Sequence, residues 1–430
     1  MTASATKTAT ETAVRTAPQG GTENGARHLA QSRARSTGYG APAGTDLTIA
    51  GDGSYAARLA RRSGDAWFPE RWTLDGPEPY AVELPGHQPE EPCSDVLPMA
   101  DGRVLIRRSV DGRHAFSLLY PTGPDTGELP LGAVECGRLT LLPPAPGGSR
   151  AYALAPGAHS TTVWLVAGGA FGPEHIAEVP GRCTGGVWLD RTGRMLALDR
   201  ETGGVTKTVA VDLERGGEVS PLLQIADGSD DRLLLADPDS GLLLVRSDAP
   251  GDERLGWGVL GSRRPVRFPE CLRVEDAVVT PFAVQPGQVL MPESCGVALR
   301  IADAAGSRLG VWRPAGRRLL QRAAPEGWLA GAGLWSAEGV LRLPCTTGAA
   351  PVGVVDIRPL DGLPLDLRME PSGDRATEPA QTEDAGQEPC TAQVTPPVCK
   401  PVPLQQAPLT SRSQPGRNRG SAHATVVARS

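Results

Sequence analysis

The run Gly186-Val187-Trp188-Leu189-Asp190-Arg191-Thr192-Gly193-Arg194-Met195-Leu196-Ala197-Leu198 contains two apolar stretches on either side of a polar turn with a glycine. This arrangement is the signature of a β-hairpin. A second copy, residues 333–343, also begins with Gly-x-Trp ahead of its turn glycine. In a third, residues 233–245, leucine-rich stretches flank the turn. The local pattern therefore predicts strand pairs rather than helices.

Turn glycines of this kind recur along the chain at separations of 45 to 52 residues. Each interval has room for a second strand pair, as residues 205–225 illustrate. Four strands in a repeat of about 47 residues are typical of a propeller blade. The sequence thus predicts an all-β propeller with seven four-stranded blades. The seven glycines are Gly53, Gly102, Gly148, Gly193, Gly241, Gly287 and Gly339.

A second interpretation of the strands is a pair of packed β-sandwiches divided near residues 258–267, although it does not explain the period. The propeller is expected to span residues 44–369. Residues 1–43 are rich in Thr, Ala, Gly and Ser, and residues 370–430 in Pro, Gln, Thr and Ser. Such segments bury too little apolar surface to offset the entropy of ordering. Both tails are therefore predicted to be disordered.

The pattern of apolar and polar residues in the predicted strands is the one expected for propeller blades. The inner strands of a propeller are covered on both faces, so they need not alternate, and residues 242–245 are continuously apolar. Outer strands have one wet face, and Val209, Val211 and Leu213 alternate as such a strand would. Small residues suit the packing between blades, and Cys93, Cys136, Cys183 and Cys271 each lie near the expected start of a first strand.

Residues 188–198 resemble the blade motif of TolB-type and prolyl-oligopeptidase-type propellers, in which an aromatic strand precedes Asp-x-x-Gly and an apolar strand. Residues 99–106 are a shortened version of the motif, which also describes WD-repeat-like blades. The resemblance implies a propeller that binds proteins or gates an attached hydrolase. No such hydrolase is indicated, because Gly147-Gly148-Ser149-Arg150-Ala151 lacks the final glycine of the nucleophile elbow.

Composition limits the partners. The net charge is −6, and only three lysines accompany forty arginines. Nucleic-acid-binding domains normally carry a basic stripe. No run reaches the roughly 18 apolar residues of a membrane span, and residues 1–20 lack the apolar core of a secretory signal. We expect a cytoplasmic monomer that contacts neither nucleic acid nor membrane.

Metal and catalytic motifs are not evident. The eight cysteines include no Cys-x-x-Cys pair of the kind that structural zinc sites use, so we interpret them as reduced and mostly buried thiols. The six histidines are scattered and are expected to be exposed or locally bonded. No catalytic residue, metal ligand or cofactor-binding residue is assigned, and no cofactor is predicted. The histidines are His28, His87, His114, His159, His175 and His423.

One group of carboxylates makes a catalytic function an alternative to be considered. The start of each first strand should face the central channel, where several blades could together supply oxygen ligands to a hard cation. This arrangement would suit a metal-dependent lactonase-like or sugar-processing enzyme. The simpler interpretation is ordinary turn carboxylates on a solvated rim. The residues concerned are Asp95, Glu135, Asp231, Glu275 and Asp276.

The preferred function is a noncatalytic scaffold that presents a propeller face to a protein or peptide. Aromatic and arginine side chains dominate interface energetics. Trp67, Trp72, Trp257 and Trp328 lie near expected turns or strand ends and are the first candidates, although propeller tryptophans often pack between blades. Sequence leaves the partner, the substrate and the presence of catalysis undecided.

Limited proteolysis is expected to remove both tails quickly and to leave a resistant core close to residues 44–369, because only that region has the apolar content to fold. Mass spectrometry of the fragments measures this. Early cleavage near residues 258–267 into two stable halves would instead support paired sandwiches.

Overall fold

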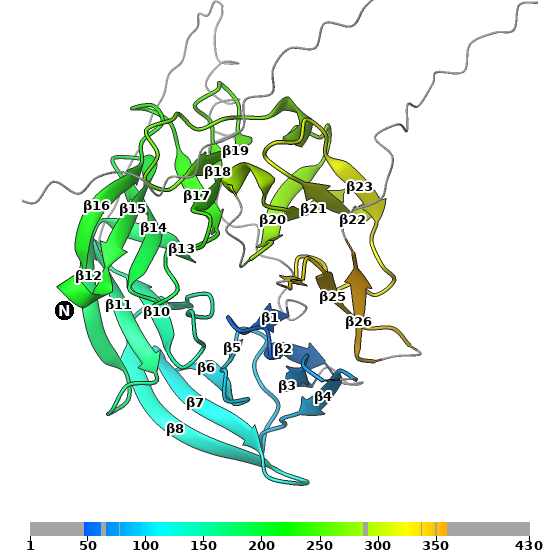
Figure 1. The fold of residues 1–430 in the computed structure, drawn as a ribbon. Helices are drawn as coiled ribbons and strands as arrows, with labels where there is room; N and C mark the ends of the chain where they lie inside the picture. Colours follow the sequence, from blue (N-terminus) through cyan, green and yellow to red (C-terminus); the bar gives the residue numbers. More distant parts are fainter. Residues whose placement is uncertain are drawn as a thin grey trace, which may run out of the picture. The chain divides into compact units, whose positions relative to one another are not determined.

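Strands make up almost all of the regular structure in the computed structural model (Figure 1). The structure describes residues 47–61, 66–76, 78–286, 291–336, 338–348 and 351–358. All of these residues lie within Met1–Leu363, the first of the two units into which the chain divides. The predicted tails, residues 1–43 and 370–430, and the turn glycine Gly287 lie outside the described residues.

The strands form seven antiparallel sheets in which sequence neighbours are also spatial neighbours. Five sheets have four strands. They are β1 (Thr48–Ile49), β2 (Tyr55–Arg61), β3 (Trp67–Thr73) and β4 (Tyr80–Glu83); β5 (Asp95–Pro98), β6 (Val104–Val110), β7 (Arg113–Pro121) and β8 (Thr126–Glu135); β9 (Thr140–Leu141), β10 (Ala151–Pro156), β11 (Ser160–Ala167) and β12 (Glu174–Pro180); β13 (Arg182–Trp188), β14 (Met195–Thr202), β15 (Val205–Asp212) and β16 (Glu218–Leu223); β20 (Val278–Val284), β21 (Val297–Asp303), β22 (Gly306–Trp312) and β23 (Leu320–Ala323).

The other two sheets have three strands each within the described residues. They are β17 (Asp231–Ala236), β18 (Leu242–Ser247) and β19 (Arg254–Val259), and β24 (Leu334–Trp335), β25 (Leu341–Cys345) and β26 (Gly353–Ile357). Three single-turn 3-10 helices are η1 (Leu213–Arg215), η2 (Glu270–Leu272) and η3 (Pro292–Ser294). Within the part of the chain that the structure describes, no helix is both long and apolar enough to cross a membrane.

The seven sheets are the blades of a propeller, numbered one to seven along the chain. First strands of consecutive blades contact one another, as β1 contacts β5, β13 contacts β17 and β17 contacts β20. In Figure 1 these strands lie nearest the centre and the last strands lie farthest out. The all-β, seven-bladed prediction is confirmed, and the paired sandwiches are excluded.

The predicted turn glycines occupy equivalent positions. Each described one joins the first two strands of its blade and has a positive φ, from 62° at Gly148 to 80° at Gly102 and Gly339. Residues with a Cβ rarely adopt this conformation, whereas glycine adopts it readily. The backbone N–H of Gly102 donates to the Met99 carbonyl, and that of Gly148 donates to the Ala145 carbonyl in the same way. The described turn glycines therefore share one backbone conformation at the same position of their blades.

These turns also lie against the preceding blade. A Cβ on Gly148 of blade three would approach Ala100 Cβ of blade two to 2.7 Å, and the Ala100 N–H donates to the Gly148 carbonyl. A Cβ on Gly102 would meet the Tyr55 ring of blade one at 3.0 Å. Glycine is required both for the turn conformation and for the close approach of successive blades.

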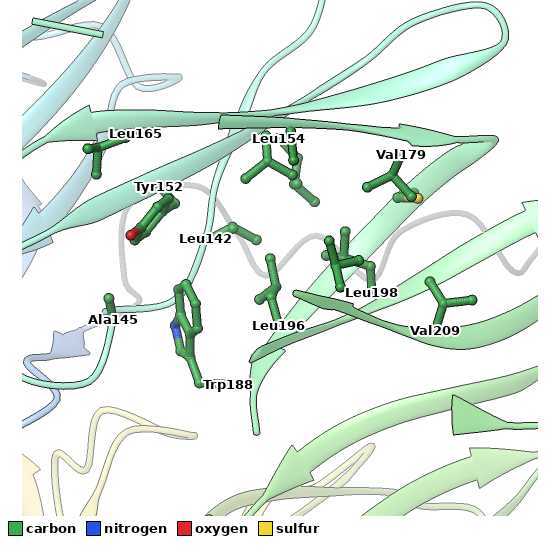
Figure 2. Close-up of a cluster of buried hydrophobic side chains, with 14 residues drawn as sticks. Leu142, Ala145, Tyr152, Leu154, Leu165, Val179, Trp188, Leu196, Leu198 and Val209 are labelled. Atoms are coloured by element: carbon green, nitrogen blue, oxygen red, sulfur yellow. The ribbon is translucent and has the colours of Figure 1, made fainter. Parts of the chain in front are cut away.

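Apolar side chains fill the space between blades. Tyr152 and Trp188 both belong to the core between blades three and four (Figure 2). Their ring centroids are 5.3 Å apart. Leu196 and Val211 in the same cluster have no exposed surface. Burial of one such side chain contributes about 1.5–3 kcal/mol, so each blade is stabilised mainly by its neighbours.

The ring closes between blades seven and one by packing. Trp72 and Leu74 of the first blade lie in one cluster with Ala332, which precedes β24 of the last blade. The guanidinium of Arg342 in β25 donates to the Leu74 carbonyl at 3.1 Å. Closure between the described strands therefore depends on side chains rather than on a sheet shared by both ends.

Two expectations need correction or refinement. The third strand β15 was predicted to have a wet face, yet its alternate residues Thr206, Thr208 and Ala210 are buried as well, because blade five covers them. All six described cysteines are free thiols, but only Cys183, Cys295 and Cys345 are buried. Cys390 and Cys399 lie outside the described residues.

Candidate functional site

The carboxylates predicted at the channel mouth occupy three different settings. Asp95 and Asp231 begin β5 and β17, the first strands of their blades, as expected. The predicted position of Glu135 was wrong, because this residue ends β8, the outermost strand of blade two. It pairs there with Arg113 of β7. Glu275 and Asp276 lie exposed in the turn before β20. The five residues do not share one rim.

Three of these carboxylates already face a cation. The distances are 2.7 Å from Asp95 to Arg107, 2.9 Å from Glu135 to Arg113 and 2.7 Å from Asp231 to Lys207. Among the described residues, no three His, Cys, Asp or Glu side chains are grouped so that they could hold a metal ion. The predicted metal-dependent enzyme at the channel therefore has no support from the geometry of these residues.

Asp231 is instead the centre of a buried hydrogen-bond network. Its side chain has no exposed surface and accepts from Lys207 Nζ at 2.7 Å, Ser229 Oγ at 2.8 Å, Ser247 Oγ at 2.6 Å and the Ile225 N–H at 2.9 Å. Burial disfavours the charged form, but the hydrogen bonds from Lys207 and Ser247 outweigh it and hold the pKa of Asp231 below its usual value. The network joins blades four and five.

A second network lies in blade two. The Arg107 guanidinium contacts Asp95 Oδ2 at 2.7 Å, His114 Nδ1 at 3.0 Å and the Cys93 carbonyl at 2.8 Å. His114 is buried, and burial together with the charge of Arg107 lowers its pKa. This neutral histidine accepts from arginine and orients it. The sequence pattern had placed His114 among unremarkable histidines, because its arginine partner comes from the adjacent strand.

Of the four tryptophans proposed as interface residues, three are buried. Trp72 is fully buried and donates to Glu70, and Trp328 donates to the Ala332 carbonyl at 2.8 Å. Trp67 is partly exposed beneath Arg61. Trp257 is 4% exposed and forms one wall of a groove. The alternative that propeller tryptophans pack between blades therefore holds for most of this group.

The Trp257 groove is a hollow of about 330 Å³ between blades five and six. Its lining residues are 257–259 at the end of β19, residues 262, 264, 265 and 267 of the following loop, and residues 291–293 at η3. Ligand pockets are commonly about 300–1,000 Å³. Met291 beside it is 67% exposed and Leu260 is 38% exposed, so apolar surface continues outward from the groove.

The groove has a fixed wall and a charged rim. Trp257 and Arg267 exchange backbone hydrogen bonds of 2.8 and 2.9 Å, and the Arg267 guanidinium lies 5.1 Å from the Trp257 ring centroid. Arg264 lies 4.0 Å from Glu293, whose Oε2 is buried and has no hydrogen-bond partner within the described part of the chain. The groove therefore offers an apolar wall, two guanidinium groups and one buried acceptor.

A smaller hollow of about 160 Å³ lies on blade five beside η2. Its three arginines each face a carboxylate, so little charge is left for a ligand. The pairs are Arg246 with Glu253, Arg254 with Glu270, and Arg273 with Asp252. The Trp257 groove is the stronger candidate site. Sequence reasoning identified its tryptophan but missed Arg264, Arg267 and Met291.

No family model and no curated protein matches this chain. Similar solved structures include a puromycin-hydrolyzing peptidase from Mycobacterium tuberculosis, at 17% identity, TM-score 0.47, and 76% coverage of this chain and 52% of that one. Prolyl oligopeptidase B from Galerina marginata gives 10% identity, TM-score 0.45, and 73% and 48% coverage. TolB from Acinetobacter baumannii gives 10% identity, TM-score 0.39, and 70% and 80% coverage.

The chain spans about half the length of the two peptidases. At these identities and TM-scores the likeness carries nothing about activity. The resemblance to TolB and prolyl-oligopeptidase propellers is confirmed as architecture, by the seven sheets themselves.

Millimolar calcium, magnesium or manganese is expected to leave the unfolding midpoint unchanged, because Asp95, Glu135 and Asp231 each face a cation and no acidic side chains are grouped as metal ligands in the described part of the chain. Differential scanning fluorimetry measures this, since a ligand at 100 times its Kd would stabilise by about 2.7 kcal/mol. A rise of several degrees that Asp231→Asn combined with Glu275→Gln abolishes would restore the metal hypothesis.

Asp231→Asn is expected to lower the free energy of unfolding by about 3–5 kcal/mol, the usual effect of removing one partner of a buried ion pair. Because the native pKa is lowered, this stabilisation is present at neutral pH and is lost as the pH falls through the titration range of the carboxyl. Urea titration at pH 7 and at lower pH measures both effects. Asp95→Asn is the control, since its 45% exposed side chain should contribute only about 0–1 kcal/mol. Equal losses of unfolding free energy in the two variants would show that the Asp231 network contributes no more stability than the exposed Asp95 side chain.

Proposed function

We propose that this propeller is a noncatalytic scaffold that binds an extended segment of a protein or peptide partner in the Trp257 groove. The observation that carries the proposal is the groove itself, whose apolar wall opens onto the exposed side chain of Met291. Contiguous exposed apolar surface with a polar rim is typical of interaction sites.

The position of the groove favours a segment rather than a small molecule. It lies along the end of β19, the last strand of a blade with three strands in the described part. Beyond β19, only Arg267 forms a bridge to the strand, opposite Trp257. An extended chain can lie along such an edge and place alternate side chains in the hollow. The wall is rigid, which reduces the ordering cost of binding.

Noncatalytic binding is supported by how the titratable groups are used. The buried aspartate Asp231 and the buried histidine His114 are both committed to internal partners. Neither lines the groove. The cytoplasmic location and the monomeric state expected from the sequence remain predictions.

Selection of a displayed peptide library on the immobilised full chain tests the proposal. Selected peptides are expected to bind Met291→Glu at least about tenfold more weakly, because a charge would replace an apolar contact worth about 1.5–3 kcal/mol. Phe171→Glu in blade three is the matched control, since Phe171 is an apolar side chain that is 95% exposed. Both variants should keep the wild-type unfolding midpoint.

Mass spectrometry of the recovered peptides tests the absence of catalysis, and unchanged peptides are expected. Loss of binding in Phe171→Glu with retention in Met291→Glu would place the interface elsewhere. Cleaved peptides would show that the scaffold assignment is wrong.

A further inference from the structure

The loop that forms one side of the Trp257 groove is strongly basic. Residues 261–267 contain Arg263, Arg264 and Arg267 and no acidic residue. All three arginines are exposed. Among the described residues, the only carboxylate found within 4 Å of their guanidinium groups is that of Glu293, at the 4.0 Å limit from Arg264. The chain as a whole carries a net charge of −6, so this local excess is not a general property of its surface.

The arginines of the neighbouring hollow differ from those of the loop because they are all paired. Arg246, Arg254 and Arg273 each have a facing carboxylate supplied by the chain itself. At the groove, two of the three guanidinium groups lack such a carboxylate in the described part, and Arg267 is held in place by the Trp257 ring. A guanidinium fixed by stacking is ready to form a two-pronged hydrogen bond with a carboxylate.

We propose that the segment bound by the groove is an extended acidic peptide in which carboxylate side chains alternate with apolar ones. This inference rests on the function proposed above. Successive side chains of an extended chain point in opposite directions. Apolar side chains would then enter the hollow against Val259 and Met291, and the acidic ones would meet Arg264 and Arg267 at its rim.

The spacing of the arginines also fits this occupant. Three arginines within the five residues 263–267 match several carboxylates along a segment better than one terminal carboxylate. Glu293 repels the acidic side chains, but the loop outnumbers it by three positive charges to one.

Two capped peptide libraries test the proposal on the full chain. In both, apolar residues occupy alternate positions, and the remaining positions are Asp or Glu in one library and Lys or Arg in the other. Fluorescence polarisation is expected to show at least about tenfold tighter binding of the acidic library. Added salt should weaken that binding, because exposed charges are screened.

Arg264→Glu combined with Arg267→Glu is expected to remove or reverse the preference for the acidic library. Arg264→Glu alone should shift the preference the same way by at least about threefold, which covers the case in which loss of Arg267 disturbs the wall. The matched control is Arg138→Glu combined with Arg182→Glu, two exposed arginines with no ion pair in the described part. The control changes the net charge equally and should leave the preference intact.

The other outcomes separate the two proposals. Equal binding of both libraries that Met291→Glu abolishes would overturn the acidic partner but leave the peptide-binding groove. Binding of neither library, or binding that Met291→Glu does not affect, would overturn the groove as the site. Self-association in sedimentation velocity that Met291→Glu abolishes would identify a second copy of the chain as the occupant, and would overturn the acidic peptide.

Discussion

The close approach of inner hairpin turns to the preceding blade, as at Gly53, Gly102 and Gly148, is the constraint on which the rest of this fold depends. At Gly53 the φ angle is 78°, and a Cβ there would lie 2.2 Å from Leu334 of blade seven. At Gly148, two blades further on, the same two conditions recur against Ala100. A side chain at either position would strain the turn and also push two blades apart. The glycine repeat sets the spacing of the ring, and the apolar clusters between blades then fill the space that this spacing leaves.

Close packing between blades also determines where chemistry can occur. Strands covered on both faces leave little water for a charged group, so the carboxylates there are bound by internal partners, as Asp231 is by Lys207 and Asp199 is by Thr208. Burial raises the pKa of Asp199, whereas the lysine beside Asp231 keeps the pKa of that carboxyl low. Both aspartates accept hydrogen bonds across the junction of blades four and five, Asp199 from the Leu233 N–H and Asp231 from Lys207. Buried acids that are fully occupied in this way are poor candidates for metal ligands, which shifts attention to the outer edges of the blades.

The sequence was sufficient to predict the features that follow from one local rule. The turn glycines gave the fold class, the number of blades and, in the six blades whose turn glycine is described, the position of the first hairpin. The prediction for Glu135 was wrong because it assumed that a cysteine neighbour marks a first strand, whereas β8 continues to residue 135. The wet face predicted for β15 was wrong because Thr208 lies against blade five. Both errors concern contacts between units, which a pattern within one unit does not contain. The sequence did not predict the groove because it too is a contact between units: Trp257 and Met291 come from different blades.

The groove itself results from a local departure from the repeat. In four-stranded blades an outer strand covers the third strand, but after β19 the chain contains Pro265 and Pro269, which have no backbone N–H to donate. Pairing there is restricted to the single bridge between Trp257 and Arg267. The remaining loop residues are free to carry three arginines, and the long connection from β20 to β21 brings η3 to the other side. A fourth strand with regular pairing would place its own side chains where the hollow now lies. The irregular pairing after β19 therefore leaves the part of this edge at which we propose that a partner segment binds.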